Sequence, residues 1–192
     1  TGVIGQPMPL DIITKGIAAA AKELGSHIAL KLAADIDMTG KTWTALINNS
    51  DGYMSNIDLV DGQNHKISNL TITGTHDFAA FGMFYNVGQD MTFKNLTVEN
   101  AVIDTTKPKV GVLVGEIASG TVLFDNVTVK GANIKGESKM GTLVGQITED
   151  GTGKAIVKDC TIDGIVMETT RAEVRCGGVA GWVCTLNSNG SI

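Results

Sequence analysis

Four aspartates in the first third of the chain have the chemistry of a metal site or of an acid/base pair. Carboxylate oxygens are ligands that calcium prefers, and two neighbouring carboxylates can cleave a polysaccharide by acid/base catalysis. Asp35, Asp37, Asp58 and Asp61 form no Asp-x-Asp-x-Asp-Gly loop, however. Because Asp is common in turns, the sequence favours turn roles for these residues.

The other residue types that catalyse reactions or bind metals are scattered. No two of the histidines His27, His65 and His76 are spaced by three or four residues, so they form no zinc pattern. Segment 151–154 reads Gly-Thr-Gly-Lys but lacks the complete frame of a phosphate-binding loop. No Gly-x-Ser-x-Gly element is present. The sequence therefore predicts no catalytic residue, no metal site and no cofactor, and it favours a protein that is not an enzyme.

Trp182 is the first candidate for ligand binding. It aligns with Asn86, Glu116 and Gln146 of earlier repeats, which are polar and should line the outside of the molecule. A tryptophan at this position either stacks on a sugar ring or a partner, or is covered by the segment that follows Cys184.

The loop from Met167 to Arg175 supplies the other candidates. It contains both arginines of the chain and a glutamate between them. Since this loop and Trp182 interrupt an otherwise regular pattern, they are where we expect a ligand to bind. The candidate ligand-binding residues are Trp182, Arg171, Glu173 and Arg175.

Asn-x-Ser/Thr triplets that match the N-glycosylation pattern begin at Asn48, Asn69, Asn95 and Asn126. Three of them belong to a recurring motif. An Asn at a corner accepts unusual backbone angles and can hydrogen-bond to the same Asn of the next repeat. This structural role explains the recurrence without a sugar, and the sequence favours it.

Composition limits the classes of protein to consider. The chain has 192 residues, 43% of them hydrophobic, which is enough for one sizeable core. The net charge of −5 contains no block of like charges, so we expect no nucleic-acid partner. The longest apolar run, 17–21, is far too short to span a bilayer, and any export signal would already have been removed. The 24 glycines and 5% aromatic residues favour an all-β repeat protein.

Two short motifs recur along the chain and define a repeat of about thirty residues. In each copy two apolar residues flank a Thr, as Leu96 and Val98 flank Thr97, so the apolar pair should point inward. Such a unit cannot bury its apolar face alone, and the copies must therefore stack as a solenoid. The anchors of the two motifs are Thr71, Thr97, Thr128 and Thr161, and Met83, Leu113, Leu143 and Val179.

The N-terminal region differs from the repeats. Apolar residues from Asp11 to Leu24 fall on one helical stripe, with Asp11 and Gly25 as caps, so we expect an α-helix that covers the first end of the solenoid. The expected organisation is one domain with a leader at 1–10, the capping helix and an irregular first coil at 11–56, repeats at 57–185, and a tail at 186–192.

The three cysteines fall in the last repeat. Cys160 takes the place of apolar core residues of earlier copies, and so does Cys176. The sequence favours three small buried thiols, with Cys184 as the third. A disulfide, most simply between Cys176 and Cys184, is the alternative in an exported protein.

The second motif resembles a known repeat. Segments 110–115 (Val-Gly-Val-Leu-Val-Gly) and 140–145 (Met-Gly-Thr-Leu-Val-Gly) resemble the GLUG repeat of bacterial surface and secreted proteins, and segment 176–181 is similar. Segments 32–38 and 61–70 look like the lead-in to such repeats in surface proteins of gut Bacteroidetes. The first copy departs from the pattern because Tyr85 stands where later copies have Gly.

The resemblance covers roughly residues 28 to 184 and implies a fold and a location. The fold would be a right-handed parallel β-helix, here of about five coils with the N-terminal helix as a cap. The location would be the extracellular or outer-membrane surface, with a lipid anchor upstream in many members. GLUG proteins are described as adhesin-like with no agreed activity, so the resemblance supplies no catalytic residues.

We therefore expect a non-enzymatic cell-surface module that binds a host glycan or protein, or that contacts flanking domains of its own chain. Two alternatives remain open. A β-helix polysaccharide lyase or glycoside hydrolase would need carboxylates and basic groups that converge on one groove. An accessory domain of a secreted peptidase would need a catalytic domain elsewhere in the gene.

Overall fold

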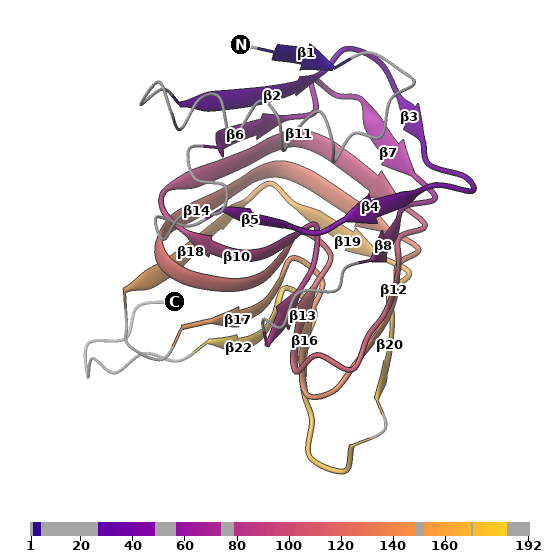
Figure 1. The fold of residues 1–192 in the computed structure, drawn as a ribbon, viewed down its shortest axis with the longest axis vertical. Coiled ribbons are helices and arrows are strands. Elements are labelled where there is room, and N and C mark those ends of the chain that lie inside the picture. The colour runs from indigo at the N-terminus through magenta and orange to yellow at the C-terminus, as the bar shows by residue number, and fades with distance from the viewer. Residues whose placement is uncertain are drawn as a thin grey trace.

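The computed structural model describes residues 2–4, 27–48, 57–73, 79–148, 152–169 and 171–183. In these residues the protein is all-β, and parallel strands stack as a solenoid of about four turns. The coils run from β1 (Gly2–Ile4) and β2 (Ile28–Leu32) at the top of Figure 1 to β20 (Val166–Thr169) and β22 (Ala180–Val183) at the bottom. The predicted helix from Asp11 to Leu24 lies outside the described residues. None of the described segments forms a helix that is long and apolar enough to cross a membrane.

Each turn from β6 onward passes over four faces, which we call A, B, C and D in chain order. Face A contains β1, β2, β6 (Ile57–Asp61), β11 (Met91–Glu99), β14 (Val114–Lys130) and β18 (Gly153–Lys158), and beyond a corner β3 (Ile36–Asp37), β7 (Lys66–Ser68) and β19 (Thr161–Asp163). Face B contains β4 (Thr42–Thr44), β8 (Thr71–Thr73), β12 (Val102–Asp104), β15 (Asn133–Gly136) and β20. Face C contains β9 (Ala80–Phe81), β13 (Lys109–Gly111), β16 (Lys139–Gly141) and β21 (Arg175–Gly177). Face D contains β5 (Leu46–Asn48), β10 (Phe84–Gly88), the start of β14, β17 (Val144–Ile147) and β22.

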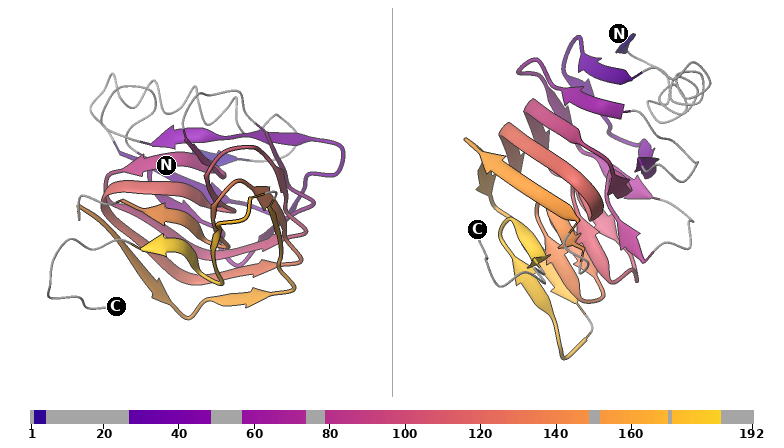
Figure 2. Two further views of the ribbon diagram at one scale, coloured as in Figure 1. Left: turned by 90° about the horizontal axis from the view of Figure 1, so that it is seen from below. Right: turned by 90° about the vertical axis from the view of Figure 1, so that its left-hand side faces the viewer.

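The strands of each face lie side by side as rungs, as the two rotated views show (Figure 2). On face A, Val60 pairs with Phe93, Phe93 with Phe124, and Phe124 with Val157. The Phe93 and Phe124 rings stack with their centroids 5.4 Å apart. Equivalent side chains of successive turns therefore build one continuous core, as the repeat predicts.

The predicted inward and outward positions are confirmed where the turns are stacked on both sides. Leu96 and Val98 are completely buried, as are Val127 and Val129 of the next turn. The threonines between them, such as Thr97, are only partly buried. The sequence alternation therefore places the core correctly.

The predicted alignment of the first repeat was wrong. Thr97 pairs with Thr128, but its partner in the preceding turn is Lys66. Thr71 lies on face B, where it pairs with Val102. Each turn has two similar corners. The first corner lies within face A, at Asn95 and Asn126, and the second lies between faces A and B, at Asn69 and Asn100. The first Asn-Leu-Thr triplet, which begins at Asn69, therefore stands at the second corner, whereas the later triplets stand at the first. The second series of anchors was aligned correctly, because Phe84 pairs with Val114 and Val114 with Val144.

The corners use asparagine in the way that the recurring triplets predict. Asn95 and Asn126 have positive φ angles of 50° and 54°, and the Asn126 amide donates to Asn95 Oδ1 at 3.0 Å. At the second corner, Asn100 has a φ of 55° and donates to Asn69 Oδ1 at 3.3 Å. A left-handed backbone suits Asn, and the ladder of amides satisfies its side chain.

The first copy departs from the later ones because the preceding turn is shorter. Face C begins at β9 in the described residues, since β4 is followed almost directly by β5. Tyr85 opposes Gly115 of the next turn, and its ring is buried against Phe81 in an edge-to-face contact at 5.4 Å. The first turn has no face C strand to collide with Tyr85. The described residues form about four turns, one fewer than the five coils predicted.

The cysteines are less buried than predicted. Cys176 pairs in register with Met140, so it faces inward as expected, but it is exposed, and Cys160 is partly buried. Both are free thiols. The reason is their place in the last described turn, where no further turn covers the core. Cys184 lies outside the described residues.

Candidate ligand-binding surface

Three basic residues begin consecutive strands of face C. Lys109 pairs in register with Lys139, and Lys139 with Arg175. Seven residues later, each chain segment reaches an outward-facing position of face D. These positions also align, from Glu116 to Gln146 to Trp182.

Close packing of the backbone brings each basic residue beside its face D partner. A Cβ added to Gly145 would collide with the backbone nitrogen of Val110 and would lie 2.6 Å from the carbonyl oxygen of Gly115. Glycine at this position therefore lets faces C and D meet in a tight arch. The arch places the first residue of a face C strand against the outer side of face D.

The three pairs are chemically different. Lys109 Nζ lies 2.7 Å from Glu116 Oε1 in a mostly buried ion pair, with side-chain exposures of 20% and 14%. Lys139 Nζ donates to the neutral Gln146 Oε1 at 2.7 Å. The Arg175 guanidinium carbon lies 3.5 Å from the centroid of the Trp182 ring. The acidic partner is thus replaced first by an amide and then by an indole.

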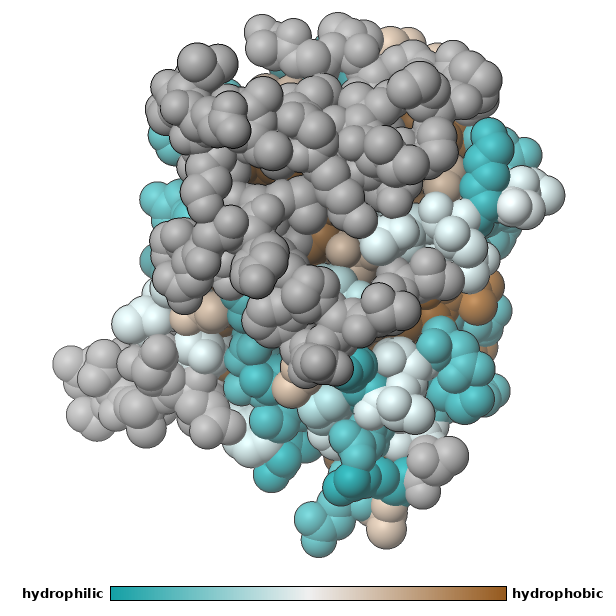
Figure 3. Space-filling model, viewed as in Figure 1, coloured by the Kyte–Doolittle hydropathy of each residue, from teal (hydrophilic) through white to brown (hydrophobic). Residues whose placement is uncertain are grey.

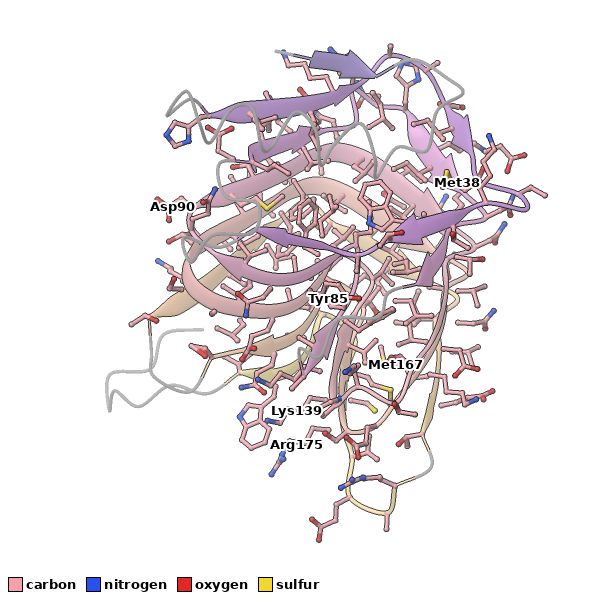
Figure 4. All side chains as sticks on the ribbon, viewed as in Figure 1. Met38, Tyr85, Asp90, Lys139, Met167 and Arg175 are labelled. Carbon is pink, nitrogen blue, oxygen red and sulfur yellow. The ribbon has the colours of Figure 1, made fainter. Side chains whose placement is uncertain are left out.

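Trp182 contacts two cations. Lys139 Nζ is 4.2 Å from the same ring centroid that Arg175 covers. Lys139 and Arg175 lie together at the corner of faces C and D, near the C-terminal end of the solenoid (Figure 4). In the space-filling view this lower part of the molecule is mainly hydrophilic (Figure 3). We call Lys139, Arg175 and Trp182 the cation–indole cluster.

The basic ladder of face C is unlike the other charge ladders. On face A, Asp61, Lys94, Asp125 and Lys158 alternate in sign from one turn to the next. Like charges on neighbouring strands are destabilising, so alternation is what stability alone favours. On face C the basic residues follow one another instead; Glu116 compensates the charge of Lys109 within its own turn, so Lys139 and Arg175 are the in-register basic pair that departs from this alternation.

The structure brings together only two of the four predicted ligand-binding residues. Arg175 and Trp182 are in contact, whereas the Arg171 guanidinium forms an ion pair with Glu137. Glu173 is exposed, and none of the described side chains forms an ion pair with it. Arg171 therefore ties its loop to the preceding turn.

Sequence analysis missed Lys139 as a member of the cluster. The signal that could have found it is the recurrence of a basic residue seven positions before each outward position of face D. The polar neighbours of Trp182 in its ladder are also less exposed than predicted, at 3% for Gln146 and 9% for Asn86. The Lys139 side chain packs on Gln146 and helps to cover it.

The aspartates of the first two turns do not converge on a site. Asp35 accepts hydrogen bonds from the Lys66 backbone and the His65 ring, and Asp58 lies 3.6 Å from His27. No group of three or more potential metal ligands exists within the described ranges. These carboxylates serve turns and pairs, which is the role that the sequence favours.

Asp37 is the most strongly perturbed of these aspartates. The Asn69 side chain donates to Asp37 Oδ1 at 2.9 Å, and the Thr39 hydroxyl and backbone N–H donate to the same oxygen. These hydrogen bonds lower the pKa of Asp37 from 3.8 to about 2, with Asn69 as the largest cause. Asp37 therefore caps the Asn ladder of the second corner as an anion.

Comparisons with known proteins add one partial similarity. Over 92 residues the chain is 38% identical to halomucin of Haloquadratum walsbyi. The match covers 48% of this chain, which spans about 1% of the length of halomucin. No family model matches the chain, and no solved structure matches it.

Proposed function

We propose that the protein is a non-enzymatic extracellular module that binds an acidic ligand through the cation–indole cluster. The observation that carries this proposal is the Arg175 guanidinium stacked at 3.5 Å on Trp182, at the end of a ladder of like charges. Lys139 and Arg175 lie in register on neighbouring strands, and a ligand with negative charge would be attracted by both.

The chemistry of the cluster favours a carboxylated or sulfated glycan. A guanidinium that stacks on a ring keeps its in-plane N–H groups, which match the two oxygens of a carboxylate or sulfate. Arg175 is exposed, and no described carboxylate pairs with it. Trp182 holds the guanidinium in place, so less conformational freedom is lost when a ligand binds. An acidic protein surface is the second ligand of the same chemistry.

The location that we propose is the cell surface or the extracellular space. The resemblance of segments 110–115 and 140–145 to GLUG repeats supports it, and so does the similarity to a protein named halomucin. We infer right-handed winding of the coils, because crossover connections between parallel strands are right-handed in about 98% of cases. A lipid anchor upstream, and flanking domains as further partners, belong to the same proposal.

A glycan array with neutral, carboxylated and sulfated glycans tests the proposal, run with the full chain and three variants. We expect binding to acidic glycans that weakens at least about tenfold in Arg175→Gln and in Trp182→Ala, and that falls with rising salt. Arg171→Gln is the matched control, because this arginine is in the same loop but already paired with Glu137. It should bind like the unchanged chain.

Three results would contradict the proposal. The first is binding only to neutral glycans, and the second is equal loss in Arg171→Gln and Arg175→Gln. The third is depolymerisation of any polysaccharide in a parallel assay, which would favour the enzyme alternative.

A further inference from the structure

Two corners in the described part of the chain consist of an Asp followed by a Gly. These pairs are Asp61-Gly62 and Asp163-Gly164. The carboxyl group of an Asp can react with the backbone nitrogen of the next residue, and Gly favours this reaction because it has no Cβ to shield its nitrogen. Whether either pair reacts therefore depends on how the fold holds that nitrogen.

At the second corner of each turn, the backbone N–H of the corner residue bonds to the following turn. The bonds run from Asn69 to the Glu99 carbonyl, from Asn100 to that of Lys130 and from Gly131 to that of Asp163, at 2.9, 2.8 and 2.9 Å. Gly164 takes this position in the last described turn, and its N–H has no acceptor among the described residues. The Gly164 nitrogen is therefore free because no further described turn follows it.

The corner at Gly164 is otherwise like the corner before it. Gly131 and Gly164 have the same φ of 64°. Asp163 and Gly164 are both exposed, and a Cβ built on Gly164 would lie no closer than 3.6 Å to its listed neighbours. The corner therefore leaves room for the Asp163 carboxyl group to approach the nitrogen of the next residue.

The other pair is held in an unreactive state. The Gly62 N–H donates to the Lys94 carbonyl oxygen at 2.9 Å, and Asp61 Oδ1 accepts a hydrogen bond from the Gln63 backbone at 2.9 Å. Asp61 is only 7% exposed, and a Cβ on Gly62 would lie 2.3 Å from the carbonyl oxygen of Asn95. Reaction at this pair would break both hydrogen bonds and displace closely packed backbone.

We propose that Asp163-Gly164 is a site of spontaneous aspartate isomerisation. In the first step the Gly164 nitrogen bonds to Cγ of Asp163, and the amide hydrogen leaves with the carboxyl hydroxyl as water. In the second step water opens the five-membered ring. Attack at Cγ restores aspartate, whereas attack at the main-chain carbonyl carbon gives isoaspartate. The water lost in the first step is regained in the second, so no other reactant is required.

Isoaspartate lengthens the main chain by one methylene group at this corner. Shortly after the corner, β20 pairs with β15, and the Val166 N–H donates to the Ala132 carbonyl oxygen at 2.9 Å. A longer corner disturbs this register, so amide exchange in β20 should be faster in the isomerised chain. The inference is independent of the proposed function, because the cation–indole cluster contains neither Asp163 nor Gly164.

Incubation of the full chain in water enriched in heavy oxygen tests the proposal. Ring opening leaves one heavy oxygen atom in the product, and digestion in ordinary water followed by mass spectrometry assigns it to a peptide. We expect the peptide with Asp163 to gain label at least about tenfold faster than the peptide with Asp61, whose reaction requires local opening. Separate peptides are necessary because Asp51-Gly52, Asp150-Gly151 and Asn189-Gly190, which lie outside the described residues, have related chemistry.

Two variants test the cause of this selectivity. Gly164→Asn should slow the labelling of Asp163 at least about tenfold, because its Cβ shields the nitrogen. Asn69 and Asn100 show that Asn fits this corner with a positive φ. Lys130→Asp creates an Asp-Gly pair at the preceding corner, where Gly131 has the same φ but a bonded N–H. This new pair should gain label slowly, like Asp61-Gly62.

Three results would overturn the proposal. The first is the absence of label and of isoaspartate at Asp163. The second is equal labelling of Asp163 and of the new pair in Lys130→Asp, which would mean that the free N–H is not the cause. The third is equal labelling at Asp61, which would mean that the fold does not select between the pairs. None of them affects the glycan-array test of Arg175 and Trp182.

Discussion

Asparagine at the corners shows how single residues hold the turns in register. Asn95 and Asn126 adopt a left-handed backbone that most residues avoid, and the amide of one bonds the amide of the next. The same side chain therefore meets a backbone requirement and a packing requirement. Asn recurs along the chain for this reason, and the sequence could predict its role without any sugar.

Asp37 replaces Asn at the first step of the second ladder and makes stability depend on pH. Its pKa falls from 3.8 to about 2 in the folded protein. A lowered pKa means that the stabilisation is fully present above about pH 4 and is lost as the pH falls towards 2. We expect the difference in Tm between the unchanged chain and Asp37→Ala to be constant from pH 7 to 5 and to shrink between pH 4 and 2.

Two further variants separate the causes of this pH dependence. Asp37→Asn keeps the shape of the side chain but has no titrating carboxyl group. The difference in Tm between Asp37→Asn and Asp37→Ala should therefore stay constant between pH 4 and 2. Thr39→Val removes only the hydroxyl that donates to Asp37 Oδ1. In this variant the loss of Tm between pH 4 and 2 should be smaller than in the unchanged chain, but still present. A difference between the chain and Asp37→Ala that stays constant down to pH 2 would contradict the lowered pKa.

At the scale of elements, the two corners of each turn explain where sequence reasoning failed. Asn69-Leu70-Thr71 and Asn95-Leu96-Thr97 read alike, but the first stands at the second corner of its turn. Short motifs with period-2 alternation cannot distinguish two similar corners. The Gly motifs were aligned correctly because the closely packed glycines of the arch between faces C and D, such as Gly115 and Gly145, recur at the same place in successive turns. Two of the three members of the cation–indole cluster, Arg175 and Trp182, were predicted, and Lys139 was missed because contact across an arch is not visible in the order of residues.

The arch between faces C and D predicts a sharp contrast between two glycines. Gly145→Ala puts a Cβ against the backbone of Val110 and Gly115, atoms that cannot move without disturbing both ladders. We expect a loss of about 1–3 kcal/mol or more in the free energy of unfolding, measured by denaturant titration. Gly178→Ala is the control, because nothing lies within 4 Å of its added Cβ. Its cost should stay within about 0.5 kcal/mol, and equal losses would contradict the role of the arch.

At the scale of the whole molecule, the repeat made the solenoid predictable and its ends unpredictable. Stacking follows from any repeat that cannot bury its own apolar face, so four aligned copies were sufficient. Burial at each level depends on the turn above and the turn below. Cys176 was predicted to be buried from the positions of Val110 and Met140, but those residues have neighbours on both sides. The residue types within a repeat therefore do not show whether a further turn packs against it.

Stability should therefore fall along the solenoid towards its open end. Phe124 and Val157 occupy the same ladder position of face A, one between two turns and the other in the last turn. Phe124→Ala should cost about 3–5 kcal/mol, since it empties a fully buried site stacked on Phe93. Val157→Ala should cost less than about 1 kcal/mol, because its side chain is already 41% exposed.

Native-state hydrogen exchange provides the independent measure of this gradient. In a stack whose turns contact only their neighbours, the last turn can open while the others stay folded. Amides of β18–β22 should exchange through such local opening, and Val157→Ala should accelerate them without changing β14. Phe124→Ala should accelerate both regions. If Val157→Ala accelerated exchange in β14 to the same extent, the turns would unfold as one unit, and the proposed gradient would be wrong.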